Sequence, residues 1–211
     1  SVLDGLVAGW PADASPKLTD ADKAQIAALG KSLPADQRDR LLVLASRWGQ
    51  KEIFAGQLDE VLKTVANTLV AENASTADRV DAARRMLRLS DNTKTIDAIL
   101  KQVSPQAPAE LSRGLISALS DSRVDEAADQ IIGKWEAFTP AARKSAVSVM
   151  MRRAPWTLSM LNAIKDKKLT RGDLAASDWQ SLRLHKDRAI SSLARKLDTN
   201  TMDANRAKVL T

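Results

Sequence analysis

The chain has 211 residues and a formal net charge of +6, with 44% hydrophobic and 27% charged residues, values typical of a folded domain. It contains no cysteine and a single histidine, His185. This excludes disulfides, thiolate metal sites and cysteine nucleophiles, and it leaves little from which to build a zinc site. Only 3% of the residues are aromatic, which favours packed helices over a β-sandwich.

The N-terminal part is predicted to contain a helix end, a loop and a capped helix. Residues 1–18 are expected to form the end of a preceding helix and a proline-containing loop. Thr19 should cap the next helix, because Asp22, three residues later, completes an acidic capping box. Ile26 and Leu29 would give this helix its apolar stripe.

Apolar residues at helical spacing and helix-start signals predict helix pairs from residue 34 onward. Gly49 is expected to end the first of these helices, and Ser75 to cap the third. The predicted pairs are 34–48 with 58–69, 75–87 with 93–103, 108–119 with 124–135, and 140–151 with 155–164.

The C-terminal part is less regular. A turn is expected around Gly172, and Asp178 is predicted to cap a short helix. A final amphipathic helix should span 188–197 and be broken by residues 199–201. The segment 199–211 would then lead to a following domain.

Three stretches carry apolar residues in the same register, 32 positions apart. Ala83, Leu115 and Val147 form one column, and Pro108 and Pro140, each followed by alanine, open two helices with the same spacing. A fixed period of two helices predicts stacked pairs, because one pair cannot bury its apolar face alone. We therefore expect an all-α superhelix, a HEAT- or armadillo-like solenoid of five to six helix pairs, over residues 19–198. The other columns are Met86, Ala118 and Met150; Leu87, Leu119 and Met151; and Leu100, Ile132 and Ile164.

The sequence offers no constellation of catalytic residues. Nucleotide-binding, zinc-protease and nucleophile-elbow motifs are absent, and acidic pairs such as Asp20 and Asp22 fall at helix starts. His185 lies between two expected helices, where a turn hydrogen bond explains it better than catalysis. We predict no catalytic residue, metal site or cofactor site in this segment. No apolar run is long enough to cross a membrane, so membrane insertion is not expected.

The positive charge is spread along the chain, so nucleic-acid binding is not favoured. A pair of arginines recurs late in the first helix of successive pairs, and an acidic protein would suit such a ridge. The alternative to a passive scaffold is therefore a basic solenoid that binds nucleic acid or an acidic protein. The candidate interaction surface consists of Arg84, Arg85, Arg152 and Arg153. The five tryptophans, at or near helix ends, are expected to be core residues or wedges between repeats.

Several short segments, in their order along the chain, resemble one family. They are 5–11, 42–49 (Leu-Val-Leu-Ala-Ser-Arg-Trp-Gly), 82–84, 139–143 (Thr-Pro-Ala-Ala-Arg), 155–157 (Pro-Trp-Thr), 161–164, 173–174 and 185–190 (His-Lys-Asp-Arg-Ala-Ile). In these segments the chain is similar to the helical region of large haem-binding, membrane-bound dehydrogenase-like proteins of planctomycetes and verrucomicrobia. The resemblance covers nearly the whole chain.

The resemblance implies a place between a sugar-dehydrogenase-like β-propeller and a c-type cytochrome domain with a CxxCH motif, which alone would carry covalent haem. It also implies export to the periplasm or cell surface. The neighbouring domains of the parent chain, and beyond these another protein, would be the partners. No catalytic residue of the family corresponds to a position here, and Lys186 stands where the family often has proline. The expected function is a non-catalytic scaffold and interaction module that acts as a spacer in a larger redox protein.

Overall fold

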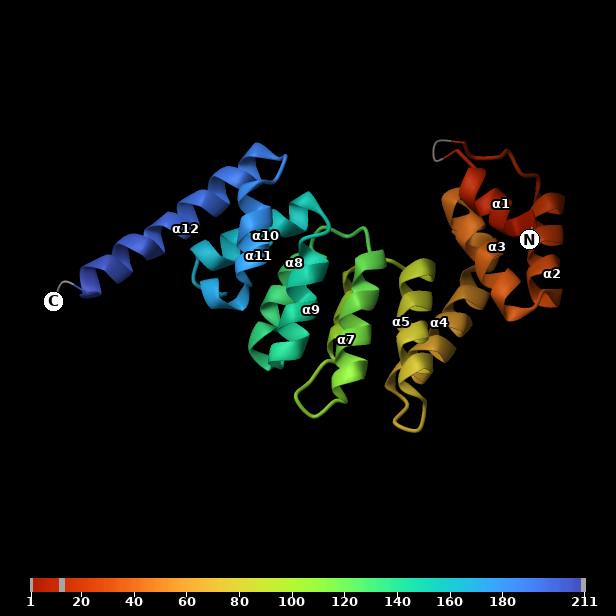
Figure 1. Ribbon diagram of the computed structural model, residues 1–211. Helices are drawn as coiled ribbons and strands as arrows, with labels where there is room; N and C mark the ends of the chain where they lie inside the picture. The colour runs from red at the N-terminus through yellow and green to blue at the C-terminus, as the bar shows by residue number, and fades with distance from the viewer. Residues whose placement is uncertain (1, 12–13, 210–211) are drawn as a thin grey trace.

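Helices form all the regular structure in the computed structural model, which describes residues 2–11 and 14–209 (Figure 1). The α-helices are α1 (Val2–Gly9), α2 (Asp20–Ser32), α3 (Ala35–Arg47), α4 (Ala55–Val70), α5 (Thr76–Leu89), α6 (Thr93–Leu100), α7 (Ala109–Ala118), α8 (Ala127–Gly133), α9 (Pro140–Met150), α10 (Ala154–Lys165), α11 (Ala176–Arg183) and α12 (Arg188–Val209). Four 3-10 turns join them: η1 (Lys51–Phe54), η2 (Leu119–Asp121), η3 (Trp135–Ala137) and η4 (Arg171–Asp173). The all-α prediction is confirmed.

Local hydrogen bonds set several helix ends where the sequence places them. The Thr19 hydroxyl accepts a bond from the Asp22 N–H at 3.2 Å, and the Asp22 carboxylate accepts one from the Thr19 N–H at 2.9 Å. This reciprocal arrangement is the predicted capping box. Ser75 caps α5 by accepting from the Asp78 N–H at 3.1 Å. Gly49, with φ of +72°, takes the left-handed conformation after α3 that glycine adopts without strain.

The middle of the chain is built from two rows of helices. In one row α5 packs against α7 and α7 against α9, and in the other α6 packs against α8 and α8 against α10 (Figure 1). The helix α4 covers the free side of α5, while α12 packs on α10 and α11. Each helix of a row therefore packs against the helix that comes two places later in the chain.

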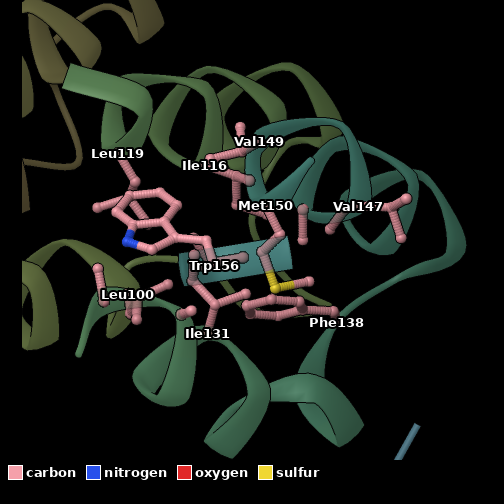
Figure 2. Close-up of a cluster of buried hydrophobic side chains, with 14 of the residues drawn as sticks. Leu100, Ile116, Leu119, Ile131, Phe138, Val147, Val149, Met150 and Trp156 are labelled. Carbon is pink, nitrogen blue, oxygen red and sulfur yellow. The ribbon is translucent and has the colours of Figure 1, made fainter. Parts of the chain in front are cut away.

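The apolar columns read from the sequence lie in the core. Ala83 and Leu115 are fully buried, and Val147 is 3% exposed. Ile132 and Met151 are partly buried at its edge. Figure 2 shows how side chains from both rows, among them Leu100, Leu119 and Trp156, gather in one cluster. Burial of this apolar surface is the main force that holds the rows together.

The buried apolar residues form two clusters. The larger one extends from α4 to α12, and the smaller one contains Leu41, Leu42, Ala45, Phe54 and Leu89. The smaller cluster joins α3, η1 and the end of α5, with residues of α1 and α2 at its edge. Val61 of α4 packs against both clusters. The N-terminal helices therefore have a core of their own.

One side chain of the expected core lies elsewhere. The prediction that Leu29 faces inward is wrong, because its side chain is 47% exposed. The buried residue at this point of α2 is Gly30, and a Cβ added to it would lie 2.5 Å from Phe54 Cε1. The helix therefore approaches η1 through its glycine, a close contact that a larger side chain would prevent.

Several predicted helix boundaries are displaced by a few residues; α6, for example, ends at Leu100 rather than at residue 103. Asp178 does not cap α11: it lies in the first turn, and its carboxylate accepts from the Ala175 N–H at 2.9 Å. Trp135 is outside α8, because that helix ends at Gly133 and the chain continues into η3. Pro108 occupies the N-cap position of α7, whereas Pro140 is the first residue of α9.

The last helix is longer than predicted. Residues 199–201 do not break α12, which continues to Val209 and extends beyond the body of the molecule (Figure 1). The helix contains no glycine or proline, and threonine and asparagine in its interior lower helix propensity by only about 0.5 kcal/mol each. The expected boundary between residues 198 and 199 thus falls inside a continuous helix, and residues 210–211 lie outside the described part.

Asp198 joins α12 to the segment before it. Its two carboxylate oxygens accept hydrogen bonds from Arg171 of η4 and Arg183 of α11. The bond from Arg171 is the main cause that lowers the pKa of Asp198 below its usual range, and the positive charge of both arginines adds to it.

Candidate functional site

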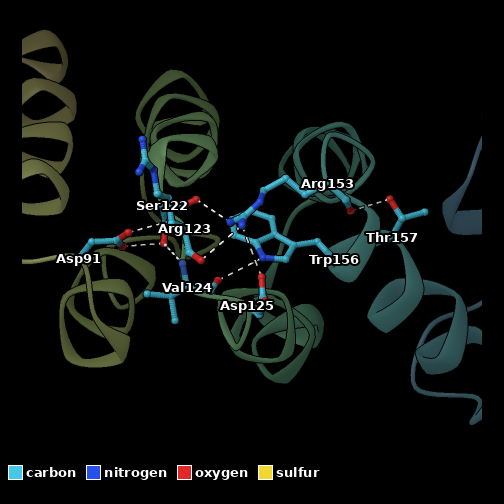
Figure 3. A network of polar contacts seen from close by, with 8 residues as sticks. All are labelled: Asp91, Ser122, Arg123, Val124, Asp125, Arg153, Trp156 and Thr157. Atoms are coloured by element: carbon cyan, nitrogen blue, oxygen red, sulfur yellow. Dashed lines mark hydrogen bonds and ion pairs between the residues drawn. The ribbon is translucent and has the colours of Figure 1, made fainter. Parts of the chain in front are cut away.

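The loops at one end of the first row are joined by polar contacts across the layers (Figure 3). Asp91, after α5, accepts from the Ser122 hydroxyl at 2.6 Å and from the Arg123 N–H at 2.7 Å. These two residues follow η2, so the bonds connect positions that are 31 and 32 residues apart. Because the acceptor is charged, the bonds are stronger than those between neutral groups.

The same loop is held from its other side by residues 153–156. Arg153 donates to the Ser122 carbonyl at 2.9 Å and to Asp125 at 3.4 Å. Its guanidinium lies 5.1 Å from the centre of the Trp156 ring, and the Trp156 indole N–H donates to the Val124 carbonyl at 3.1 Å. Residues 122–125 are therefore fixed between the loop after α5 and the start of α10.

A hollow with a volume of about 1200 Å³ lies between α3 and α5, beside η2. We call it the α3–α5 groove. Its lining combines charged, small polar and aliphatic side chains: Val7, Ala35, Asp39, Arg40, Val43, Ser46, Arg47, Leu58, Arg85, Leu87, Arg88, Leu89, Ser90, Asp91, Asn92, Asp121 and Arg123. The loop contacts described above position Asp91 and Arg123 at its edge.

Among the described residues that line the groove, five are arginines and three are aspartates. Arg85 of α5 forms a bidentate bond with Asp39 of α3, in which Nη2 lies 2.8 Å from Oδ1. Arg47 donates to the Val7 carbonyl. Within the part of the chain that the structure describes, neither the Arg88 nor the Arg123 guanidinium pairs with a carboxylate, and both residues are exposed.

The four arginines of the predicted interaction surface do not form one patch. The Arg84 side chain is half-exposed, and its Nη1 lies 3.7 Å from Oδ1 of Asp81, whereas Arg85 faces the groove. Arg152 is exposed, and Arg153 is engaged with the loop at 122–125. The helix α7 lies between α5 and α9, and therefore separates the first pair from the second.

Sequence reasoning missed the groove because its residues come from distant segments. One signal was available, since Arg88 follows Arg85 by three positions and residues at this spacing share a helix face. The adjacent pair Arg84 and Arg85 points in two directions, as neighbouring residues on a helix do.

Three of the five tryptophans are buried, and each lies under an arginine. The pairs are Trp135 with Arg143, Trp156 with Arg153, and Trp179 with Arg171, with distances of 5.8, 5.1 and 5.6 Å from the guanidinium carbon to the ring centre. Trp10 and Trp48 are partly buried and meet edge to face, with ring centres 5.1 Å apart. Much of the positive charge therefore serves contacts within the protein.

His185 lies in the turn between α11 and α12, where its Nδ1 accepts from the Asp187 N–H at 3.0 Å. The turn hydrogen bond predicted for it is present. Among the described residues, no group of three or more acidic or histidine side chains is arranged to hold a metal ion. None of the described helices combines the length and apolar character that crossing a membrane requires.

No family model matches the chain, and neither a curated protein nor a solved structure matches it.

Proposed function

We propose that this chain is a non-catalytic helical scaffold whose helix pairs stack as an α-solenoid. The observation that carries the proposal is the contact between successive layers at a constant interval. Asp91 bonds to Arg123 and Trp156 bonds to Val124, and both pairs are 32 residues apart. Stacked repeats contact their neighbours in this way, and they present extended surfaces to partners.

The distribution of reactive side chains supports a binding role over catalysis. His185 bonds within a turn and does not line the α3–α5 groove. The serines that do line it, Ser46 and Ser90, have no histidine beside them to act as a base. A scaffold needs neither a base nor a nucleophile, so this arrangement agrees with the proposal.

A protein partner is better supported than nucleic acid. Phosphate binding needs clustered cations, and here several arginines lie against tryptophan rings or bond to carbonyls and carboxylates of the chain itself.

Insertion of one additional unit tests the stacking. A second copy of residues 108–139, placed after residue 139, should fold as an added layer, because each unit needs only its neighbours. Circular dichroism should show the same helicity per residue, and urea unfolding should remain cooperative. A scrambled segment of the same composition is the matched control. Loss of helicity with the true copy, as with the scrambled one, would contradict the stacked arrangement.

The place of the chain within a larger redox protein remains a prediction from the resemblance. The full gene product is expected to carry a β-propeller before Ser1 and a CxxCH motif after Thr211. The isolated chain should show no saturable haem binding in an absorbance titration. A stoichiometric haem complex would contradict a non-catalytic role for this segment.

A further inference from the structure

We propose that the α3–α5 groove is the docking site for an acidic, partly apolar peptide segment of a partner protein. This inference rests on the proposed scaffold function and assigns it a binding surface and a class of partner.

The size of the groove suits a peptide. Pockets for small molecules usually have volumes of about 300 to 1000 Å³. The groove, at about 1200 Å³, is larger, and it is bordered by α3 on one side and by α5 with the following loops on the other. A segment of several residues would fill this space, whereas a small ligand would leave much of it hydrated.

The charge of the groove selects acidic partners. Asp39 is paired with Arg85, Asp91 accepts hydrogen bonds from Ser122 and the Arg123 backbone, and Asp121 also lines the groove. Among the described lining residues, the five arginines outnumber these three aspartates. Arg88 carries an exposed guanidinium that no described carboxylate pairs with. The positive charge that remains can form bidentate bonds with glutamate or aspartate of a partner.

Arg123 offers the second such group. Its backbone N–H is fixed by Asp91, while its side chain is directed away from these bonds (Figure 3). The backbone position is therefore set in advance, which reduces the entropy lost when the side chain binds a ligand.

The apolar part of the lining favours peptide over nucleic acid. Leu87 and Leu89 are buried, while Val43 and Leu58 are partly buried and border the same space. These side chains can bury aliphatic groups of a peptide. The described residues that line the groove include no aromatic side chain, so they offer a single-stranded nucleic acid no ring on which to stack a base.

The bond between Arg85 and Asp39 has a different role. It connects α5 to α3 across the groove, with 29% of the Arg85 side chain and 13% of the Asp39 side chain exposed. We assign it to holding the two walls at their distance, and we assign recognition of the partner to Arg88 and Arg123.

A random peptide library tests the inference. Peptides of about twelve residues, selected on the intact chain, should be enriched in aspartate and glutamate interspersed with aliphatic residues. Fluorescence anisotropy of the selected peptides should show binding that weakens as salt rises. The double variant R88E/R123E should lose at least about tenfold in affinity, because both recognising charges are reversed.

The control is the double variant R113E/R188E, which changes the net charge equally at exposed positions outside the groove. It should bind the selected peptides within about twofold of the wild type. Circular dichroism of both variants separates loss of binding from loss of fold. The inference is overturned by no enrichment, by equal losses in both double variants, or by tighter binding of a short DNA duplex that R88E/R123E also weakens. If peptides fail to bind while the inserted unit folds, only the groove assignment is wrong.

Discussion

The substitution Gly114→Ala adds one methyl group, which has two opposing effects of similar size on the stability of the fold. Gly114 lies in α7, and a Cβ at this position would be 2.5 Å from Cγ2 of Val80 in α5. Alanine raises helix propensity by about 1 kcal/mol relative to glycine. Overpacking a close interface costs about 1 to 3 kcal/mol. Val80 is buried and stiff at χ1, so we expect overpacking to prevail, with a net destabilisation of up to about 2 kcal/mol.

Urea unfolding of a double-mutant cycle measures the clash directly. In a Val80→Ala background the two nearest methyl groups are removed, and Gly114→Ala should then stabilise the protein by about 1 kcal/mol. The coupling between the two sites is therefore expected to be about 1 to 3 kcal/mol. Gly133→Ala, in open space at the end of α8, is the control and should not destabilise. A Gly114→Ala effect that is equal in both backgrounds would refute the close approach of α5 and α7.

Further predictions concern the core and the last helix. Leu100→Ala should lower the free energy of unfolding by about 2 to 5 kcal/mol, and Ile132→Ala by less, because Leu100 is 1% exposed and Ile132 only partly buried; urea unfolding curves will show whether this order is reversed. Asp198→Asn should destabilise by about 1 to 2 kcal/mol at neutral pH, because the bonds from Arg171 and Arg183 lose their charged acceptor. The low pKa of Asp198 in the folded state means that its contribution is complete above about pH 4 and is lost as the pH falls through that pKa. Thermal unfolding midpoints of the wild type and this variant should therefore converge in acid, and a constant difference would contradict the pairing.

Local signals predicted the elements well. Thr19, Ser75 and Gly49 act within a few residues of their own positions, so their roles are decided by the neighbouring sequence. Burial of the apolar columns was predicted equally well. Apolar residues that recur at helical spacing, such as Leu115, mark the face of the helix that packs against the core. Residues 199–201 were misjudged as a helix break because threonine and asparagine are weak helix formers, whereas the segment contains neither glycine nor proline.

The candidate site could not be predicted in the same way. The bond between Asp39 and Arg85 joins residues 46 positions apart on different helices, and neither residue is distinctive in its local context. In α2, the sequence likewise could not predict that Leu29 is exposed and Gly30 buried, because the face of the helix that is buried depends on where Phe54 lies. Such contacts depend on how helices that are distant in the sequence pack against one another, and the local sequence does not determine this packing.

The division of the apolar core affects how the walls of the α3–α5 groove are held together. The α3 wall rests on the smaller cluster, while most of α5 belongs to the larger one, and the two cores share Val61. Leu89, at the end of α5, packs in the smaller cluster beside residues of α3, so the two walls share apolar packing there, and the Arg85–Asp39 pair joins them across the opening. The width of the opening, and with it the partners that fit, is therefore set by apolar packing at the end of α5 as well as by one ion pair.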